Sequence, residues 1–323
     1  MGKNVPAKKP GQRTVERWVT INGNHVPIFE GETEEDVKNR LNEWNKQNSK
    51  KASYHDYKDD KKKMTAQFMM NNPVMVDDAV VEALDYDVLA DVYDTIEDIK
   101  GEYNCWVSNI KLMDRTDKDG NENTSMADIN INGTMRLNPE YFESEWYLDD
   151  TYKECVSDKF HPPAPNGAIG VISHELGHAI VYEKLFNRQK ELLKGGTDWG
   201  FDGDIVSTNR WLQHPSEFPD LDTSGGKQVF KEWYEAINSV QESVASNKTI
   251  QEQWGGKSTP KRPNMSLTGM AKRFPRPYGV SGYAEKNYHE LIAESFCDVY
   301  CNGNEASLIS KEVYNALIKE MKK

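Results

Sequence analysis

Residues 170–180 read GVISHELGHAI, and this stretch decides how the chain around it folds. Successive residues of a helix turn by about 100°, so the side chains of His174 and His178, four residues apart, point only about 40° apart. Apolar side chains recur at helical spacing on a neighbouring stripe, at Ile169, Ile172, Leu176 and Ile180. We therefore expect a helix over 167–187 that has one buried side and directs two imidazoles to one place.

Two imidazoles one helical turn apart are a common part of a zinc site. Glu175 follows the first histidine, close enough to take a proton from a water on the metal without being a ligand. Gly177 fits the close approach of another segment over this helix. The competing interpretation is an ordinary amphipathic helix whose histidines face water or are satisfied by hydrogen bonds. The coincidence of two histidines and an acid on one face favours the metal site.

A catalytic zinc ion needs a third protein ligand and an open fourth position. None of the other histidines follows the motif at the Gly-x-x-His spacing; they are His25, His55, His161, His214 and His289. A carboxylate is therefore favoured, and the best place is GYAEKNYHELIAESFCDVY (282–300), where Glu290 and Glu294 are again four residues apart. One of them can bind the metal while the other accepts the N–H of a ligand histidine. The competing interpretation is a solvated acidic helix face.

Composition excludes several classes of function. The chain has 323 residues, and 40 basic against 52 acidic side chains give a net charge of −12, which argues against a general nucleic-acid binder. No secretion signal follows the basic start, and no run approaches the ~20 apolar residues of a membrane span. We expect no nucleic-acid or membrane partner, and a cytoplasmic location. Four scattered cysteines favour a reducing compartment.

The pattern along the chain predicts a small N-terminal module before the main domain. RWVTINGNHVPIFEG (17–31) indicates a β-hairpin around Asn22-Gly23, and TEEDVKNRLNEWN (33–45) indicates a helix with Thr33 as its N-cap. We assign 1–47 to this module. Residues 48–66 are polar and lack either period, which predicts a charged linker.

The main domain is predicted to cover 67–323 with an α+β fold, since strands and helices mix without a βαβ rhythm. Expected helices are 77–100, 142–158, 167–187, 227–240, 287–301 and 307–321. Expected strands are 105–114 and 126–138, and 252–282 is expected to be a loop rich in Pro, Gly and basic residues.

HELGH, followed downstream by YAEKNYHELIAESF, resembles the gluzincin-type zinc metallopeptidase domain of the anthrax lethal-factor kind. The family pattern is Tyr-Ala, then Asn, then Glu-x-x-Ala-Glu-x-Phe. It is matched here over roughly 126–300, with anchors at Tyr283, Asn287, Glu290, Ala293, Glu294 and Phe296. Residues 179–289 place 111 residues between His178 and Glu290, a longer gap than is usual in gluzincins. An insertion at about 188–281, containing at least one helix, is therefore expected.

The resemblance implies a zinc-dependent endopeptidase with a zincin-like fold, in which the active-site helix packs on a small sheet whose edge strand lines the substrate cleft. It implies one Zn²⁺ held by His174, His178 and Glu290, with Glu175 as general base. It also implies that Glu294 is the hydrogen-bond partner of a ligand histidine and that Tyr283 donates to the oxyanion. Asp298, four residues beyond Glu294, leaves open a shifted assignment in which Glu294 is the third ligand.

RWVTINGNHVPIFEG and ADININGTMRLNPEYF also resemble segments of bacteriophage structural and minor-head proteins that carry such peptidase domains, and of related toxin-like proteins. This resemblance implies a polypeptide substrate, an association with phage head or portal proteins, and a location in the cytoplasm of a host cell or in a virion. Two alternatives stay open. One is a virion structural or assembly protein whose zinc site is not catalytic, and the other is a toxin-like effector peptidase with the same chemistry.

Overall fold

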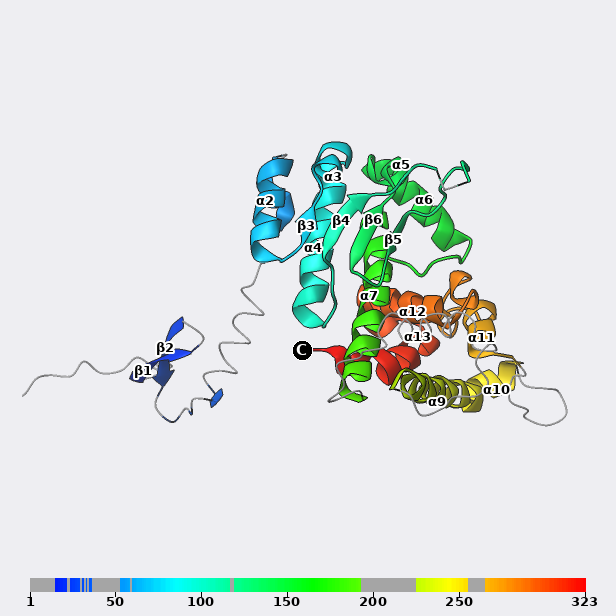
Figure 1. The fold of residues 1–323 in the computed structure, drawn as a ribbon. Helices are drawn as coiled ribbons and strands as arrows, with labels where there is room; N and C mark the ends of the chain where they lie inside the picture. Colours follow the sequence, from blue (N-terminus) through cyan, green and yellow to red (C-terminus); the bar gives the residue numbers. More distant parts are fainter. Residues whose placement is uncertain are drawn as a thin grey trace, which may run out of the picture. The chain divides into compact units, whose positions relative to one another are not determined.

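The computed structural model describes residues 15–21, 24–29, 31, 33, 35–36, 53–58, 60–116, 119–192, 225–254 and 265–323 (Figure 1). The chain divides into two units, Met1–Asp56 and Tyr57–Lys323. The described part of the second unit is mixed α+β and mostly helical, with a small four-stranded sheet. The α+β class predicted for the main domain is confirmed.

The first unit holds a β-hairpin. Strand β1 (Val15–Ile21) pairs antiparallel with β2 (Asn24–Phe29), and the last pair of the ladder is Ile21 with Asn24. The strands therefore lie on either side of the predicted Asn-Gly turn, as a two-residue hairpin loop requires. Thr33 N donates to Asp36 Oδ2, and Asp36 N donates to Thr33 Oγ1, which is a reciprocal cap of the predicted kind. Most of the predicted helix 33–45 lies outside the described residues.

The sheet of the second unit has the order β3-β4-β6-β5. Its strands are β3 (Met75–Val76), β4 (Asn109–Leu112), β5 (Ala127–Ile129) and β6 (Thr134–Leu137). The first three in this order run parallel, whereas β5 is antiparallel to β6 and forms one edge. Buried Ile110, Met135 and Leu137 alternate with exposed residues along β4 and β6, so one face of the sheet packs into the core.

Helices make up the rest of the second unit. Before the central helix come η1 (Tyr54–Tyr57, which begins in the first unit), α2 (Lys61–Asn71), α3 (Asp78–Ala83), α4 (Tyr86–Glu102), α5 (Pro139–Phe142) and α6 (Glu145–Ser157). The central helix is α7 (Gly167–Leu192). After it come α9 (Gly225–Ser246), α10 (Lys248–Trp254), α11 (Leu267–Arg273), η3 (Tyr283–Glu285), α12 (Tyr288–Asn302), η4 (Gly303–Glu305) and α13 (Leu308–Val313), then a π-helical turn η5 (Tyr314–Ile318) and a 3₁₀ turn η6 (Lys319–Met321).

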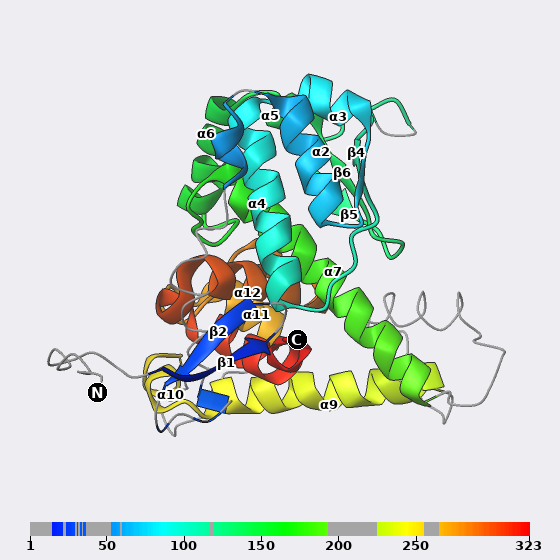
Figure 2. The same ribbon diagram turned by 90° about the vertical axis from the view of Figure 1, so that its left-hand side faces the viewer.

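Helix α7 is the axis of the second unit. It contacts α4, α6 and β5 on the side of the sheet, and α9 and α12 on the side of the C-terminal helices. Figures 1 and 2 show it running from the sheet and α2–α6 into the group formed by α9–α13. Its apolar residues Ile172, Leu176 and Ile180 are almost fully buried. Because α7 has contacts on both sides, its middle turns lie in the interior, and these turns carry the HELGH sequence.

Several predicted boundaries differ from the structure for local reasons. The end of the predicted linker, 61–66, belongs to α2, because Asp60 caps this helix at Lys63 N and Met64 is fully buried. The predicted helix 77–100 is two helices, since Asp85 accepts from Asp87 N and Val88 N and starts α4. Both cases show a capping aspartate that sets the start of a helix.

The predicted strand 126–138 is instead the hairpin β5–β6. Asn130 Oδ1 accepts from Asn132 N and Thr134 N, and Gly133 has a φ of +73°. An added Cβ at Gly133 would lie 2.9 Å from Trp106 O, so the position needs glycine for both conformation and space. The predicted loop 252–282 contains α11, which starts where Ser266 Oγ accepts from Gly269 N. The predicted last helix, 307–321, is α-helical only as far as Val313, and a π-helical turn and a 3₁₀ turn follow it.

None of the helices in the described part of the chain has the length and apolar character that crossing a bilayer takes. The four cysteines are free in the structure, and Cys297 is buried.

We expect Gly177→Ala to lower the free energy of unfolding by about 1–3 kcal/mol. An added Cβ at this position would lie 2.9 Å from Ala293 Cα, so α7 and α12 would have to move apart. Chemical denaturation measures the change. Gly101→Ala, at an exposed position of α4, is the control and should raise the free energy of unfolding by about 0.5–1 kcal/mol. A Gly177→Ala protein as stable as wild type would contradict this close packing.

Candidate metal centre

Helix α7 is capped two turns before the HELGH histidines. Asn166 Oδ1 accepts from Ile169 N at 2.9 Å, and Gly167 N donates to Asp149 Oδ1 at 2.8 Å, which ties the start of α7 to α6. These bonds satisfy backbone donors that a helix leaves unpaired at its N-terminus. His174 and His178 are then 7 % and 8 % exposed.

Helix α12 supplies the carboxylates. Asn287, one of the residues that carry the family resemblance, caps this helix by accepting from Glu290 N at 2.9 Å. The predicted close approach at Gly177 is confirmed, since Ala293 of α12 packs directly on it. Because the two helices lie so near each other at this point, Glu290 and Glu294 reach the histidines of α7.

Three potential ligand atoms converge. His174 Nε2 lies 3.1 Å from His178 Nε2, and Glu290 Oε2 lies 3.3 Å from the former and 3.1 Å from the latter. Atoms that bind a tetrahedral zinc ion at about 2.0–2.1 Å are about 3.3–3.4 Å apart. Glu290 Oε2 is also buried without a hydrogen bond in the described structure. A buried oxygen without a donor, facing two imidazole nitrogens at this spacing, fits a divalent metal site made of His174, His178 and Glu290.

Glu294 lies beside Nδ1 of His174, whereas the three converging atoms include Nε2 of the same ring. Its side chain is fully buried, and its Oε1 is 2.8 Å from His174 Nδ1 and 2.8 Å from His161 Nδ1. Burial alone would raise the pKa of Glu294, but His161 and His174 lower it to about 2. The negative charge of Glu294 at 2.8 Å from His174 Nδ1 favours a proton on that nitrogen, which leaves Nε2 free to bind a metal.

The electrostatics of the remaining site residues follow from burial and from these contacts. Burial would raise the pKa of Glu290, but His174 and His178 hold it far below its usual value. Burial would lower the pKa of His174, but Glu290 and Glu294 raise it. Glu175 differs, because burial raises its pKa more than the two histidines lower it. Glu175 therefore binds a proton more readily than an exposed glutamate.

Tyr283 is held beside the histidines by backbone bonds. Tyr283 N donates to Phe160 O and Gly282 N donates to Lys159 O, so η3 lies against the segment before α7. The Tyr283 ring centroid lies 5.8 Å from that of His174. Lys286 Nζ donates to the Tyr283 hydroxyl oxygen at 3.0 Å. Because an ammonium group has no acceptor, this bond leaves the phenol proton available to another group.

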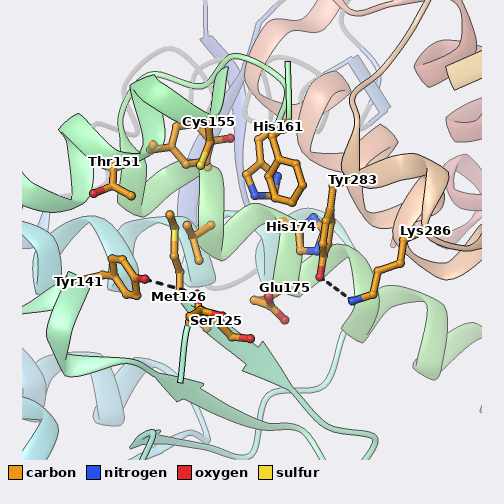
Figure 3. A pocket seen from close by; sticks show the side chains of 16 residues that line it. Ser125, Met126, Tyr141, Thr151, Cys155, His161, His174, Glu175, Tyr283 and Lys286 are labelled. Carbon is orange, nitrogen blue, oxygen red and sulfur yellow. Dashed lines mark hydrogen bonds between the residues drawn. The ribbon is translucent and has the colours of Figure 1, made fainter. Parts of the chain in front are cut away.

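A cavity of about 460 Å³ opens beside the converging atoms. His174, Glu175 and Tyr283 line it at one end, and Thr151 and Cys155 of α6 line it farther away, as Figure 3 shows. The segment before β5 also lines it, and Glu175 lies between His174 and Ser125 in this view. Glu175 thus faces an open space beside the three potential ligand atoms.

Asp298, the residue that left a shifted assignment open, lies elsewhere. It is fully buried, and its carboxylate accepts from Arg276 Nη2 at 2.7 Å, from Ser307 N at 2.9 Å and from Ser310 Oγ at 2.7 Å. Within the described residues its partners belong to the C-terminal part of the chain and include neither motif histidine. Asp298 therefore holds the loops around α12 together.

We expect Asp298→Ala to lower the free energy of unfolding by about 3 kcal/mol, the lower end for breaking a buried ion pair, because Arg276 is 32 % exposed. Zinc affinity of the folded protein should not change. Chemical denaturation and a chelator competition measure the two quantities. A stable variant that lost zinc would show that Asp298 belongs to the metal centre.

Three residues that contact the predicted site residues were not predicted from the sequence. They are His161, His289 and Lys286. His161, which lies in the segment before α7, gives no periodic signal at all. His289 precedes Glu290 directly, and the helical period of α12 places it one turn before Ala293, on the face toward α7. Lys286 follows Tyr283 by three residues, within reach in a helical turn. The Lys286 contact depends on helical spacing alone, whereas the position of His289 also needs the packing of α12 on α7.

Comparisons of the chain with family models, with curated proteins and with solved structures found no match.

Proposed function

We propose that this protein is a zinc-dependent endopeptidase of the gluzincin type, with a zincin-like fold. The observation that carries the proposal is the convergence of His174 Nε2, His178 Nε2 and Glu290 Oε2 within 3.1–3.3 Å of one another. Glu175 and Tyr283 line the cavity beside these atoms. The arrangement offers three potential protein ligands with a cavity beside them, which is what a catalytic zinc site needs.

The chain's own residues supply the groups for peptide hydrolysis. His174, His178 and Glu290 would hold the zinc ion, which when bound would supply Lewis-acid polarisation of the scissile carbonyl and a lowered pKa for the attacking water. Glu175 takes the proton of that water and passes it to the leaving nitrogen, a role that its raised pKa supports. Tyr283 donates to the carbonyl oxygen of the substrate as negative charge develops there, and Lys286 keeps the phenol oriented for this bond.

Strand β5 is a suitable place for the substrate backbone. Asn138 N donates to Met126 O and Asn130 N donates to Thr134 O. In an antiparallel ladder every second residue bonds to the neighbouring strand, so the N–H and C=O groups of Ala127 and Ile129 face away from β6. Within the described sheet no strand lies on that side. An extended peptide can pair there and pass Glu175, since Ala127 and Glu175 line the same cavity.

The alternative of a virion structural protein with a non-catalytic zinc ion needs the ligands but neither Glu175 nor Tyr283. Both lie in the cavity wall, beside the converging atoms and not among them. This placement supports the peptidase over the alternative. The predicted context, in a phage virion or as an effector, stays a prediction.

The test is metal-dependent hydrolysis of peptides. Bound zinc in the purified protein is measured first, and a peptide library is then incubated with the protein and examined by mass spectrometry. We expect one equivalent of zinc, cleavage that stops with a chelator, and recovery when zinc is added back. A protein that binds no stoichiometric zinc, or that cleaves no library peptide at any zinc concentration, would contradict the proposal.

A further inference from the structure

His289 lies directly against the second motif histidine. It is 3 % exposed, its ring centroid is 4.2 Å from that of His178, and its Nε2 is 3.2 Å from His178 Nδ1. His289 and Ala293 are one turn apart on the face of α12 that packs on α7. Ala293 meets Gly177 and His289 meets His178, so the same helix contact positions both.

Hydrogen-bond donors and acceptors fix the tautomers of this pair. His178 can present Nε2 to a metal only if its proton is on Nδ1. A buried N–H needs an acceptor, and His289 Nε2 is the atom at hydrogen-bond distance. A neutral imidazole has one donor nitrogen and one acceptor nitrogen. His289 therefore carries its own proton on Nδ1 and accepts at Nε2.

A neutral acceptor suits the charge of this site. Glu175, Glu290 and Glu294 already place three carboxyl groups around the two motif histidines. A fourth carboxylate at position 289 would add an unpaired buried charge, which is costly. An imidazole accepts the same hydrogen bond without adding charge. His174 thus has a carboxylate partner in Glu294, and His178 has an imidazole partner in His289.

We propose that His289 is the positioning residue of His178, and that its Nε2 holds the His178 ring in the orientation and tautomer that bind zinc. This inference rests on the proposed zinc site. Outer partners of ligand histidines typically change metal affinity by about 10–100-fold, and we expect an effect in this range when the acceptor is lost.

A matched pair of substitutions separates the acceptor from packing. His289→Gln places an amide oxygen near the position of Nε2, whereas His289→Met has a similar length and only a weakly accepting sulfur. Zinc affinity of the full chain is measured by chelator competition, and unfolding of the metal-free proteins is measured in parallel. The absorption spectrum of the Co²⁺-substituted proteins reports the ligand geometry.

We expect His289→Met to bind zinc about 10–100-fold more weakly than wild type, with an altered Co²⁺ spectrum. His289→Gln should keep the wild-type affinity and spectrum, while the two metal-free variants unfold alike. Equal zinc affinity in wild type and His289→Met would overturn the inference, as would an equal loss in both variants, which indicates packing alone. Failure of the proposed function gives a different result, since wild type itself would then either bind no stoichiometric zinc or bind zinc and cleave no peptide, while the comparison of the two variants concerns zinc affinity alone.

Discussion

Glu175→Gln is expected to lower the rate of peptide hydrolysis by about 10²–10⁴-fold, the usual contribution of a general base, while zinc stays bound. Glutamine keeps the shape of the side chain but cannot take a proton. Glu175 is buried in the cavity wall and is not one of the three converging ligand atoms. Its loss therefore removes the base and leaves the metal ligands in place.

The measurement is the rate of cleavage of library peptides that wild type cuts, together with the zinc content of each protein. Glu191→Gln is the matched control, because it makes the same change at an exposed position of the same helix, 16 residues and about 24 Å along the helix axis. It should keep full activity. A Glu175→Gln protein that hydrolyses the peptides at the wild-type rate would show that another group takes the proton.

Glu290→Gln is expected to weaken zinc binding by more than the roughly 10–100-fold that the loss of an outer partner causes. Glu290 Oε2 is the oxygen that faces both motif histidines and has no hydrogen bond in the described structure. An amide oxygen is a poorer zinc ligand than a carboxylate, because it lacks the negative charge that the ion attracts.

Glu294→Gln provides the comparison, since Glu294 contacts His174 and His161 through Nδ1 atoms rather than facing the Nε2 pair. Its loss should cost about 10–100-fold in affinity. Chelator competition with both variants shows which substitution lowers the zinc affinity more. A larger loss with Glu294→Gln than with Glu290→Gln would reverse the roles of these two residues.

Helical periodicity and local capping account for most of the elements that the sequence predicts well. The helix around HELGH and the helix around Glu290 have buried apolar faces, and both begin at asparagine caps. The divided strand 126–138 and helix α11 were not predicted. In both, a short polar side chain, Asn130 or Ser266, bonds to backbone N–H groups, and such local bonds leave little trace in a hydrophobic pattern.

The sequence by itself determined the pair of motif histidines and the acid between them, because four residues on a helix place two side chains on one face whatever surrounds them. Helical spacing left Glu290 and Glu294 equivalent, since the two residues are one turn apart on the same helix, and within the sequence it was the family resemblance that favoured Glu290 as the ligand. The tertiary structure separates them by geometry, because the contact of Gly177 with Ala293 fixes how α12 lies on α7. That contact turns Glu290 toward the Nε2 atoms, places Glu294 at Nδ1 of His174 and brings His289 to His178. Such distances depend on the packing of segments more than one hundred residues apart, which no local pattern encodes.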